Sequence, residues 1–421
     1  MTKRSRIAAL LVPLALLAAA CGSDDDSDSS SESSSTDAPE STDEMTESTD
    51  EMTETTDAMT ETTDAMTEST DGGGGGGDGV AAAQAIVDEY SEPATDIGPT
   101  IPLDGTPEAG LTVAWLECEQ PSCAAETVGF EDATAALGWD LIVIPADSGA
   151  QGPAVQQALD QGADFIAHSG SPLATAEEQI AAAQDAGVGY YSCYSTDVPD
   201  PENNNLYIQC GDSEGVYETG ALISNWVIAD SGGEANVLLV NIPDFPVLVS
   251  EAEGAADAYS TNCPDCTLET LDTTVDSLVA GEVPAAVASR LQANPDIDYV
   301  QFTFGDLPAG VADTLEENGL LEGVKLVGVD FSTQIGLPEI IAGRHAAWTA
   351  NPKPYAAWLM VDAMARESLG MDNPEERDNA TLPTFIVSDA EAAQAILDLG
   401  DAGWPGPETM EDQFKELWGV N

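Results

Sequence analysis

Residues 162–193 have the sequence GADFIAHSGSPLATAEEQIAAAQDAGVGYYSC. An apolar stretch at 164–168 is followed by an Ala/Glu/Gln-rich helical stretch at 174–186 and by a second apolar stretch at 188–193. Gly187 directly follows the helical stretch, where glycine commonly ends a helix because it tolerates a left-handed backbone. Strand, helix and strand in this order predict two parallel strands joined by a helix.

The same alternation continues on both sides of this segment. Further strands are predicted at 111–116, 141–144, 235–241, 267–271, 297–304, 324–329 and 345–350. Further helices are predicted at 122–137, 150–161, 213–229, 249–260, 282–293, 307–318 and 334–342. Because the region from about residue 80 onward is too long for one ordinary core, we predict an α/β fold of two doubly wound parallel-sheet lobes. Ligands of such sheets bind beyond the carboxyl ends of the strands, which here places the site in a cleft between the lobes.

The first 21 residues have the pattern of a secretory signal peptide. Lys3, Arg4 and Arg6 precede an apolar run at 7–20 that ends in small residues directly before Cys21. The cysteine at the expected cleavage point resembles a bacterial lipobox, which predicts a lipid anchor on the extracytoplasmic face of the cell membrane. The alternative is an ordinary signal peptide in which Cys21 is incidental.

Residues 22–79 form a second compositional unit. They are rich in Ser, Thr, Asp and Glu, repeat a Met-Thr-Glu motif every seven residues, and include six consecutive glycines at 72–77. One methionine in seven residues cannot form the two-position apolar seam of a coiled coil. The segment is therefore predicted to be a disordered tether, followed by an N-terminal helix and lead-in at 80–107.

The charge is strongly acidic. The chain has 77 Asp and Glu against 10 Lys and Arg, a formal net charge of −67. Such a chain could not neutralise phosphates, so we expect no nucleic acid among its partners.

Six cysteines remain when Cys21 is set aside. They allow 15 pairings, but their spacing favours neighbours: Cys118 with Cys123, Cys193 with Cys210, and Cys263 with Cys266. Cys263-Pro-Asp-Cys266 also matches a redox C-x-x-C motif, although a redox cysteine needs a helix N-terminus to lower its pKa. With two histidines in the chain, neither at ligand spacing from these cysteines, no metal site is predicted.

Several segments, taken in order, resemble the periplasmic binding proteins of the ribose type. These segments are 138–144, 161–166, 183–188, 210–220, 293–298 and 327–330, within a similarity that spans about 108–390. The resemblance implies that the chain crosses between the lobes three times. Lobe one would comprise 108–211 and 351–382, and lobe two would comprise 212–350 and 383–421.

The resemblance also implies residues of a ligand site. Asp330, in Val327-Gly-Val-Asp330, matches the ligand-binding aspartate of the family, and Asp306 aligns with an aspartate whose preceding contact residue is here Gly305. Asn351 lies beside a family glutamine position, and Glu251 stands where the family has an arginine. A pentose site of the family type is therefore not preserved in full.

Other candidates are the polar and aromatic residues near strand ends, where a sugar could hydrogen-bond or stack. The ligand candidates of this kind are Trp115, Glu117, Ser169, Phe245, Phe304 and Trp348. His168 and Ser169 could suggest a catalytic pair, but neighbours on a strand point to opposite faces. No catalytic residue is predicted.

The resemblance implies the solute-binding lipoprotein of an ABC importer. Such a protein captures a small solute, here a sugar or sugar-like molecule, and delivers it to a membrane permease, as a monomer and without a cofactor. The excess of acids could also favour a cationic ligand. Two alternatives are a receptor that feeds a membrane sensor kinase or chemoreceptor, and a secreted hydrolase that uses Asp or Glu pairs.

Overall fold

The computed structural model describes residues 75–120, 122–371, 377 and 379–420, which all belong to one compact unit. The predicted signal peptide, Cys21 and most of the predicted tether lie outside these residues. Among the described helices, none is both long and apolar enough to cross a bilayer.

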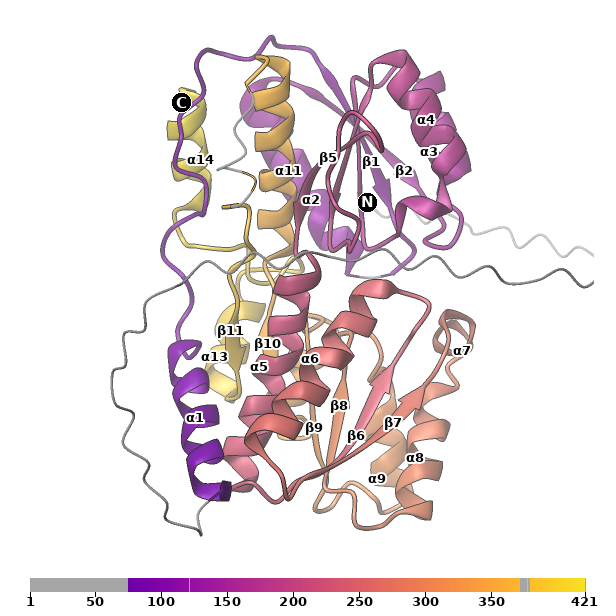
Figure 1. The fold of residues 1–421 in the computed structure, drawn as a ribbon, viewed down its shortest axis with the longest axis vertical. Helices are drawn as coiled ribbons and strands as arrows, with labels where there is room; N and C mark the ends of the chain where they lie inside the picture. Colours follow the sequence, from indigo (N-terminus) through magenta and orange to yellow (C-terminus); the bar gives the residue numbers. More distant parts are fainter. Residues whose placement is uncertain (1–74, 121, 372–376, 378, 421) are drawn as a thin grey trace, which may run out of the picture. The chain divides into compact units, whose positions relative to one another are not determined.

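Lobe one contains a five-stranded parallel sheet of order β2-β1-β3-β4-β5. Its strands are β1 Thr112–Glu117, β2 Asp140–Pro145, β3 Phe165–Ser169, β4 Gly189–Cys193 and β5 Leu206–Cys210. Its helices are α2 Cys123–Leu137, α3 Gly152–Asp160, the short η1 Leu173–Thr175, α4 Glu177–Ala186 and α11 Lys353–Ser368. Figure 1 shows helices on both sides of this sheet, as doubly wound strands require.

Lobe two contains a six-stranded sheet of order β11-β10-β9-β8-β6-β7, in which only the β10–β11 pair is antiparallel. Its strands are β6 Asn236–Asn241, β7 Thr267–Asp272, β8 Tyr299–Phe302, β9 Lys325–Gly328, β10 Ala347–Ala350 and β11 Phe385–Val387. Its helices are α5 Ser213–Ser231, α6 Pro246–Asn262, α7 Val275–Val279, α8 Val283–Ala293, α9 Val311–Glu317, α10 Gly336–Ile341 and α13 Ala390–Leu397. The predicted two-lobed α/β fold is confirmed, while β5 and β11 were not predicted.

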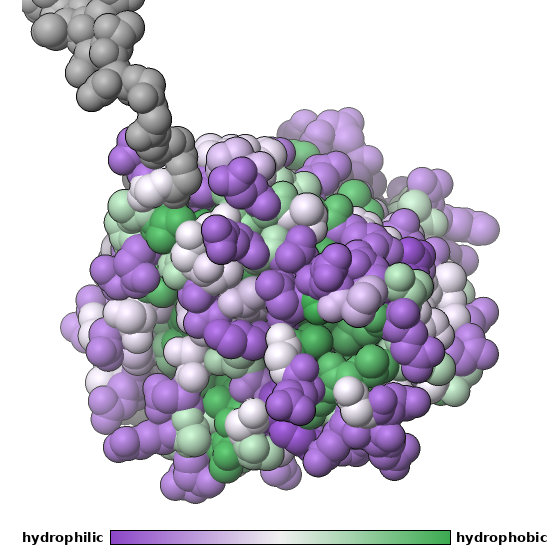
Figure 2. Space-filling model, turned by 90° about the horizontal axis from the view of Figure 1, so that it is seen from below, coloured by the Kyte–Doolittle hydropathy of each residue, from purple (hydrophilic) through white to green (hydrophobic). Residues whose placement is uncertain are grey.

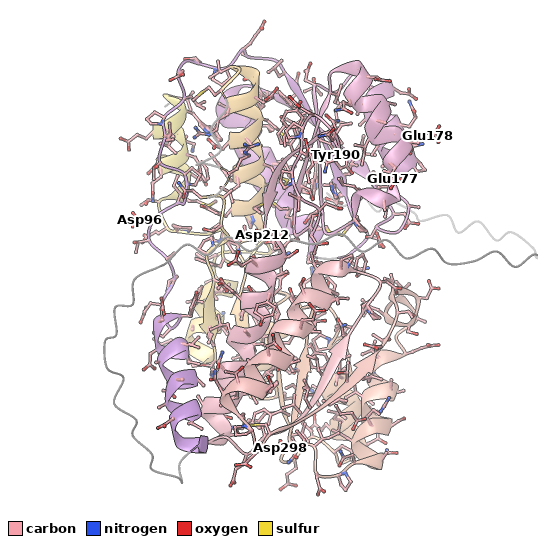
Figure 3. All side chains as sticks on the ribbon, viewed as in Figure 1. Asp96, Glu177, Glu178, Tyr190, Asp212 and Asp298 are labelled. Carbon is pink, nitrogen blue, oxygen red and sulfur yellow. A yellow bond between two sulfur atoms is a disulfide. The ribbon has the colours of Figure 1, made fainter. Side chains whose placement is uncertain are left out.

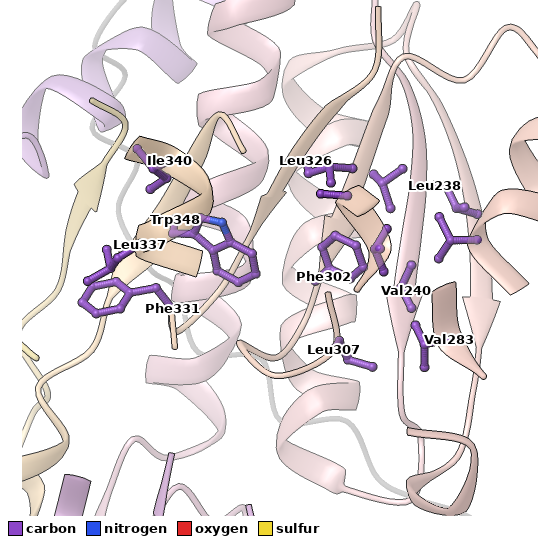
Figure 4. Packing of buried hydrophobic residues seen from close by; sticks show 14 of the residues in the cluster. Leu238, Val240, Val283, Phe302, Leu307, Leu326, Phe331, Leu337, Ile340 and Trp348 are labelled. Carbon is purple, nitrogen blue, oxygen red and sulfur yellow. The ribbon is translucent and has the colours of Figure 1, made fainter. Parts of the chain in front are cut away.

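The core of lobe two explains why its strands are almost continuously apolar. Figure 4 shows Phe302 and Trp348 among aliphatic side chains such as Leu238, Val240 and Leu326, all of them fully or almost fully buried. Helices cover both faces of a parallel sheet, so its strands bury both sets of side chains.

The face of the molecule in Figure 2 is largely hydrophilic, with smaller apolar areas between the polar ones. In Figure 3, Glu177 and Glu178 lie on the outer side of lobe one and Asp298 lies at the far end of lobe two. Asp212 lies where the lobes meet, and its side chain accepts a hydrogen bond from the Gly215 amide at the start of α5.

The N-terminal helix α1, Gly75–Glu89, packs on lobe two, against α5 and α6. Ala83 is buried in the same apolar cluster as Ile223 and Val227. The helix begins at Gly75, inside the segment predicted to be disordered. Gly79 packs directly against the backbone of Asn262, where a Cβ would lie 2.2 Å from the carbonyl oxygen, so this part of the segment belongs to the folded unit. The predicted boundary of the tether at residue 79 is therefore too late.

The C-terminal helix α14, Met410–Trp418, packs on lobe one. The sequence-based division assigned the whole of 383–421 to lobe two, and this is corrected for α14. Met410, Phe414 and Trp418 form one helix face that is buried against Tyr355 and Trp358 of α11. The placement of α14 on lobe one therefore depends on aromatic contacts with α11, a helix that is distant in the sequence.

Three passages join the lobes as expected, at β5–α5, at β10–α11 and between α11 and β11. The terminal segments add two more, because the chain passes from α1 to lobe one and from α13 to α14.

Candidate functional site

A cavity lies between the two lobes. Lobe one contributes the loop after β1, the start of α2 and the end of β3, and lobe two contributes the start of α6 and the segments after β6, β8 and β9. The carboxyl ends of parallel strands therefore face the cavity, which is the place predicted from the fold.

Lys353 is the cation of this cavity. It is the first residue of α11 in lobe one, and its Nζ lies 2.8 Å from Oδ2 of Asp330, which follows β9 in lobe two. The same Nζ lies 3.8 Å from Oε1 of Glu126 and 3.6 Å from the ring centroid of Tyr194. An ion pair thus connects the lobes across the cleft.

Glu126 projects from α2 and is 1 % exposed. Its Oε1 accepts a hydrogen bond from Ser169 Oγ at 3.0 Å, while its Oε2 has no hydrogen-bond partner. Burial raises the pKa of Glu126 to about 7, against the opposing effects of Lys353 and Ser169. Gly129, one turn later, brings α2 against α11, since a Cβ there would lie 2.4 Å from the Pro354 carbonyl oxygen.

Glu251 projects from α6 of lobe two and is 7 % exposed. Its Oε2 is buried without a hydrogen-bond partner. Burial, and then the charge of Asp330, raise the pKa of Glu251 well above its usual value. A close helix contact fixes its position, because a Cβ on Gly220 of α5 would lie 2.1 Å from the carbonyl oxygen of Glu251.

Asp306, which follows β8 in lobe two, lies near Asp330 but does not line the cavity. It is 4 % exposed, and burial, followed by the charge of Asp330, raises the pKa of its carboxyl group. Neither oxygen of its carboxyl group has a hydrogen-bond partner.

Backbone strain is concentrated at this site. Tyr194 and Asp330 have φ values of +54° and +57°, in the left-handed region that residues other than glycine rarely adopt. The Tyr194 hydroxyl donates a hydrogen bond to Oδ1 of Asn351. Gly305 allows the loop after β8 to lie against Asp330, whose carbonyl oxygen would be 1.9 Å from a Cβ at that position. Such strain is typical of segments whose shape serves a ligand.

Five of the predicted ligand residues line the cavity: Asp330, Asn351, Ser169, Phe245 and Phe304. Asp306 does not line the cavity.

Trp115, Trp348 and Glu117 lie elsewhere, which corrects their predicted placement. Trp115 is buried in the core of lobe one, and its Nε1 donates to Thr127 Oγ1 at 2.8 Å. Trp348 packs in the core of lobe two, and its Nε1 donates to His345 Nδ1 at 3.1 Å. Glu117 accepts a hydrogen bond from Thr127 and does not line the cavity. Each was chosen for its nearness to a strand end, which does not determine the face to which a side chain points.

Sequence reasoning did not select Glu126, Lys353, Tyr194 or Glu251 as ligand residues. Glu126 lies in the first turn of α2 and carries no local signal. One feature of the sequence could have pointed to Lys353 as a site residue, namely that lysine is rare in so acidic a chain. Glu251 was noted only as a departure from the family pattern.

The cysteines pair as their spacing suggested. Disulfides join Cys118 to Cys123, Cys193 to Cys210, and Cys263 to Cys266. The first pair lies on the cavity wall and closes the loop before α2. Cys263 follows the C-terminus of α6, whereas a redox cysteine is activated at a helix N-terminus.

The suggested pair of His168 and Ser169 does not assemble. His168 is fully buried and stacks on Tyr190, and burial lowers its pKa to about 3. Ser169 instead donates to Glu126. Among the described residues, no group of three His, Cys, Asp or Glu is arranged to hold a metal ion.

A second, larger groove lies on the hinge side, between α1, α5 and residues 380–384. Tyr194, Val216, Glu251 and Asn351 line both this groove and the cavity. These four residues therefore form the wall between them.

The buried carboxyl groups predict a pH-dependent stability. Glu126 has a folded-state pKa above its unfolded value of 4.5, so the folded protein holds a proton that the unfolded chain releases. This contribution is complete below about pH 4.5 and is lost as the pH rises through about 7. Glu251 and Asp306, whose pKa values are also raised, act in the same direction.

We therefore expect the free energy of unfolding to fall between pH 4.5 and 7, measured by urea unfolding at fixed salt. Glu126→Gln should flatten this slope, whereas replacing the exposed Glu131 of the same helix by Gln should leave it unchanged. An unchanged slope in Glu126→Gln would show that other groups cause the pH dependence.

A family model described as a periplasmic binding protein domain matches residues 123–370. No curated protein matches the chain.

Solved structures with the same fold are distant in sequence. An ABC transporter solute-binding protein from Mycobacterium smegmatis with bound glycerol is 20 % identical, with a TM-score of 0.59 over 70 % of this chain and 99 % of that one. A 5-methylthioribose transporter solute-binding protein from Thermotoga lettingae, in complex with 5-methylthioribose, is 17 % identical, with a TM-score of 0.60 over 76 % and 100 %. A periplasmic solute-binding protein from Actinobacillus succinogenes with bound D-allose is 16 % identical, with a TM-score of 0.57 over 68 % and 100 %. At these identities the likeness concerns the fold.

Proposed function

Because the chain belongs to the periplasmic binding protein family, we propose that it captures a sugar or sugar-like solute between its lobes and delivers it to the permease of an ABC importer. The observation that carries this proposal is the ion pair of Lys353 and Asp330 across a cavity with buried polar walls. The bound glycerol, 5-methylthioribose and D-allose of proteins with this fold support a polyhydroxylated solute.

Capture requires binding without chemistry. In an open form the carboxyl groups of the two lobes would contact water, and closure would exchange that water for solute hydroxyls. Carboxylates accept strong hydrogen bonds from such hydroxyls, and the rings of Phe245 and Phe304 offer an apolar wall. A solute that contacts both lobes binds the closed form better and thereby shifts the population toward it.

Delivery to a permease requires retention at the membrane. The family is extracytoplasmic, and the lipobox-like Cys21 with the acidic tract after it supports a lipid-anchored protein on a flexible tether. The nonenzymatic character, the monomeric state and the absence of a cofactor belong to the same proposal.

A thermal-shift screen of sugars and polyols tests this function. We expect at least one solute to raise the melting temperature of the wild-type protein, because it binds only the folded form. Asp330→Asn, which tolerates the same positive φ but has no charge, should reduce this shift strongly. Asp185→Asn on the exposed face of α4 is the matched control. An intact shift in Asp330→Asn would refute the site, and the absence of any binding solute would weigh against capture.

A further inference from the structure

The cavity holds more acid than its cation can neutralise. Four carboxyl groups surround it or lie directly behind its wall: Glu126, Glu251, Asp306 and Asp330. Lys353 is the only basic side chain among the described residues that line it. When all five groups are ionised, this centre has a formal charge of −3.

Three of these carboxyl groups, Glu126, Glu251 and Asp306, have an oxygen without a hydrogen-bond partner, and the first two line the cavity. Glu126 and Glu251 are 1 % and 7 % exposed, both line the cavity, and Oε2 of each makes no hydrogen bond. A buried carboxylate oxygen without a donor is costly, because it loses its hydration without compensation. The unpartnered oxygens therefore point to a ligand that donates protons or carries positive charge.

The existing cation does not satisfy them. Lys353 is engaged by Asp330 at 2.8 Å, and it reaches Glu126 only at 3.8 Å and through the other oxygen, Oε1. A neutral hydroxyl could donate to a carboxylate, but it would leave the excess negative charge in place. An ammonium group supplies three donors and one positive charge.

We propose that the captured solute is a small hydroxylated amine whose protonated amino group is received by Glu126 of lobe one and Glu251 of lobe two. This inference rests on the proposed function and specifies its substrate class. An ammonium group between carboxylates of opposite lobes also favours closure, since each lobe alone offers only half of the site. The apolar side chains of Phe245 and Leu248 face the remainder of the solute.

Matched pairs of neutral and cationic solutes test this proposal on the full chain. Serinol differs from glycerol, and D-glucosamine from D-glucose, in the replacement of one hydroxyl by an amine. We expect calorimetric titration at neutral pH and fixed salt to give the amine of at least one pair an affinity at least tenfold higher than that of its neutral partner.

Glu251→Gln identifies the residue responsible. It keeps the shape of the side chain and removes its charge, so the preference for the amine should fall at least tenfold. Glu253→Gln, on the exposed side of the same helix, should retain the preference. A retained melting temperature in both variants shows that any loss concerns binding.

The pH profile provides a readout that a structural role would not change. The titratable groups that line the cavity are Glu126, Glu251, Asp330, Lys353 and Tyr194, and Asp306 lies near Asp330 outside the lining. Because burial raises the pKa of Glu126 to about 7, the affinity for serinol should rise between pH 5.5 and 7.5 as this carboxyl group ionises, while that for glycerol should stay flat.

The outcomes separate the two proposals. The neutral partner could bind as tightly as the amine, or more tightly, in both pairs, while Asp330→Asn loses binding. That result would contradict the proposed amine substrate and would still support solute capture at this site. If neither serinol nor D-glucosamine binds, the proposed amine substrate is also contradicted. If no sugar, polyol or amine binds, the proposed function fails as well.

Discussion

Lys353→Met is expected to raise the ratio of open to closed protein about 10²-fold in the absence of a solute. The substitution removes the cation that joins the lobes and leaves three carboxyl groups, Glu126, Glu251 and Asp330, facing one cavity. Removing one partner of a buried ion pair costs roughly 3 kcal/mol, and each 1.4 kcal/mol corresponds to about a factor of ten. Small-angle scattering at pH 8 should therefore show a larger radius of gyration, with the tether common to both proteins.

Three variants control this experiment. Lys353→Arg keeps the charge and should stay closed. Lys325→Met removes a half-exposed lysine that pairs with Asp230 on lobe two, and should change little, because such pairs contribute only about 0–1 kcal/mol. Adding Asp330→Asn to Lys353→Met should recover part of the closure, since it removes one of the uncompensated carboxylates. A closed Lys353→Met protein at pH 8 would contradict the role given to the ion pair.

Trp418→Ala is expected to destabilise lobe one by about 4 kcal/mol, within the range of buried aromatic truncations. The side chain is 1 % exposed, its ring lies 5.1 Å from that of Trp358, and its Nε1 donates to Asp362 Oδ1 at 2.7 Å. The variant would therefore leave both a cavity and a buried carboxylate that lacks one donor. Hydrogen exchange should accelerate in α11 and α2, while lobe two should keep its protection.

Trp418→Phe separates the two contributions. It retains a stacked ring and loses the hydrogen bond to Asp362, so it should cost only about 1–2 kcal/mol. Faster exchange in lobe two rather than in lobe one would contradict the placement of α14 on α11.

Much of the fold could be predicted, because its signals are local. Several helical stretches are followed by a glycine that adopts the left-handed backbone that ends the helix, as Gly138, Gly187 and Gly232 do. The alternation of strand and helix then leaves few topologies, since parallel strands need crossover helices. The short edge strand β11 was not predicted, because a run of three apolar residues is too short to distinguish a strand from a buried loop.

The site was predictable only in part. Asp330 could be found because a motif surrounds it, and Phe304 and Ser169 because they follow or end strands. Lys353 and Glu126 could not, because neither stands in a motif.

The sequence by itself determined the two-lobed α/β architecture and the acidic character, since each depends on neighbouring residues or on composition. Only the tertiary structure decided that Glu126 and Asp330 meet at Lys353 and that Glu251 lines the same cavity. Those four residues come from α2, α6, the end of β9 and α11, and close helix contacts at Gly129 and Gly220 place them. The cavity, with its excess of acid, arises from helix packing between residues more than 200 positions apart, which no local pattern in the sequence records.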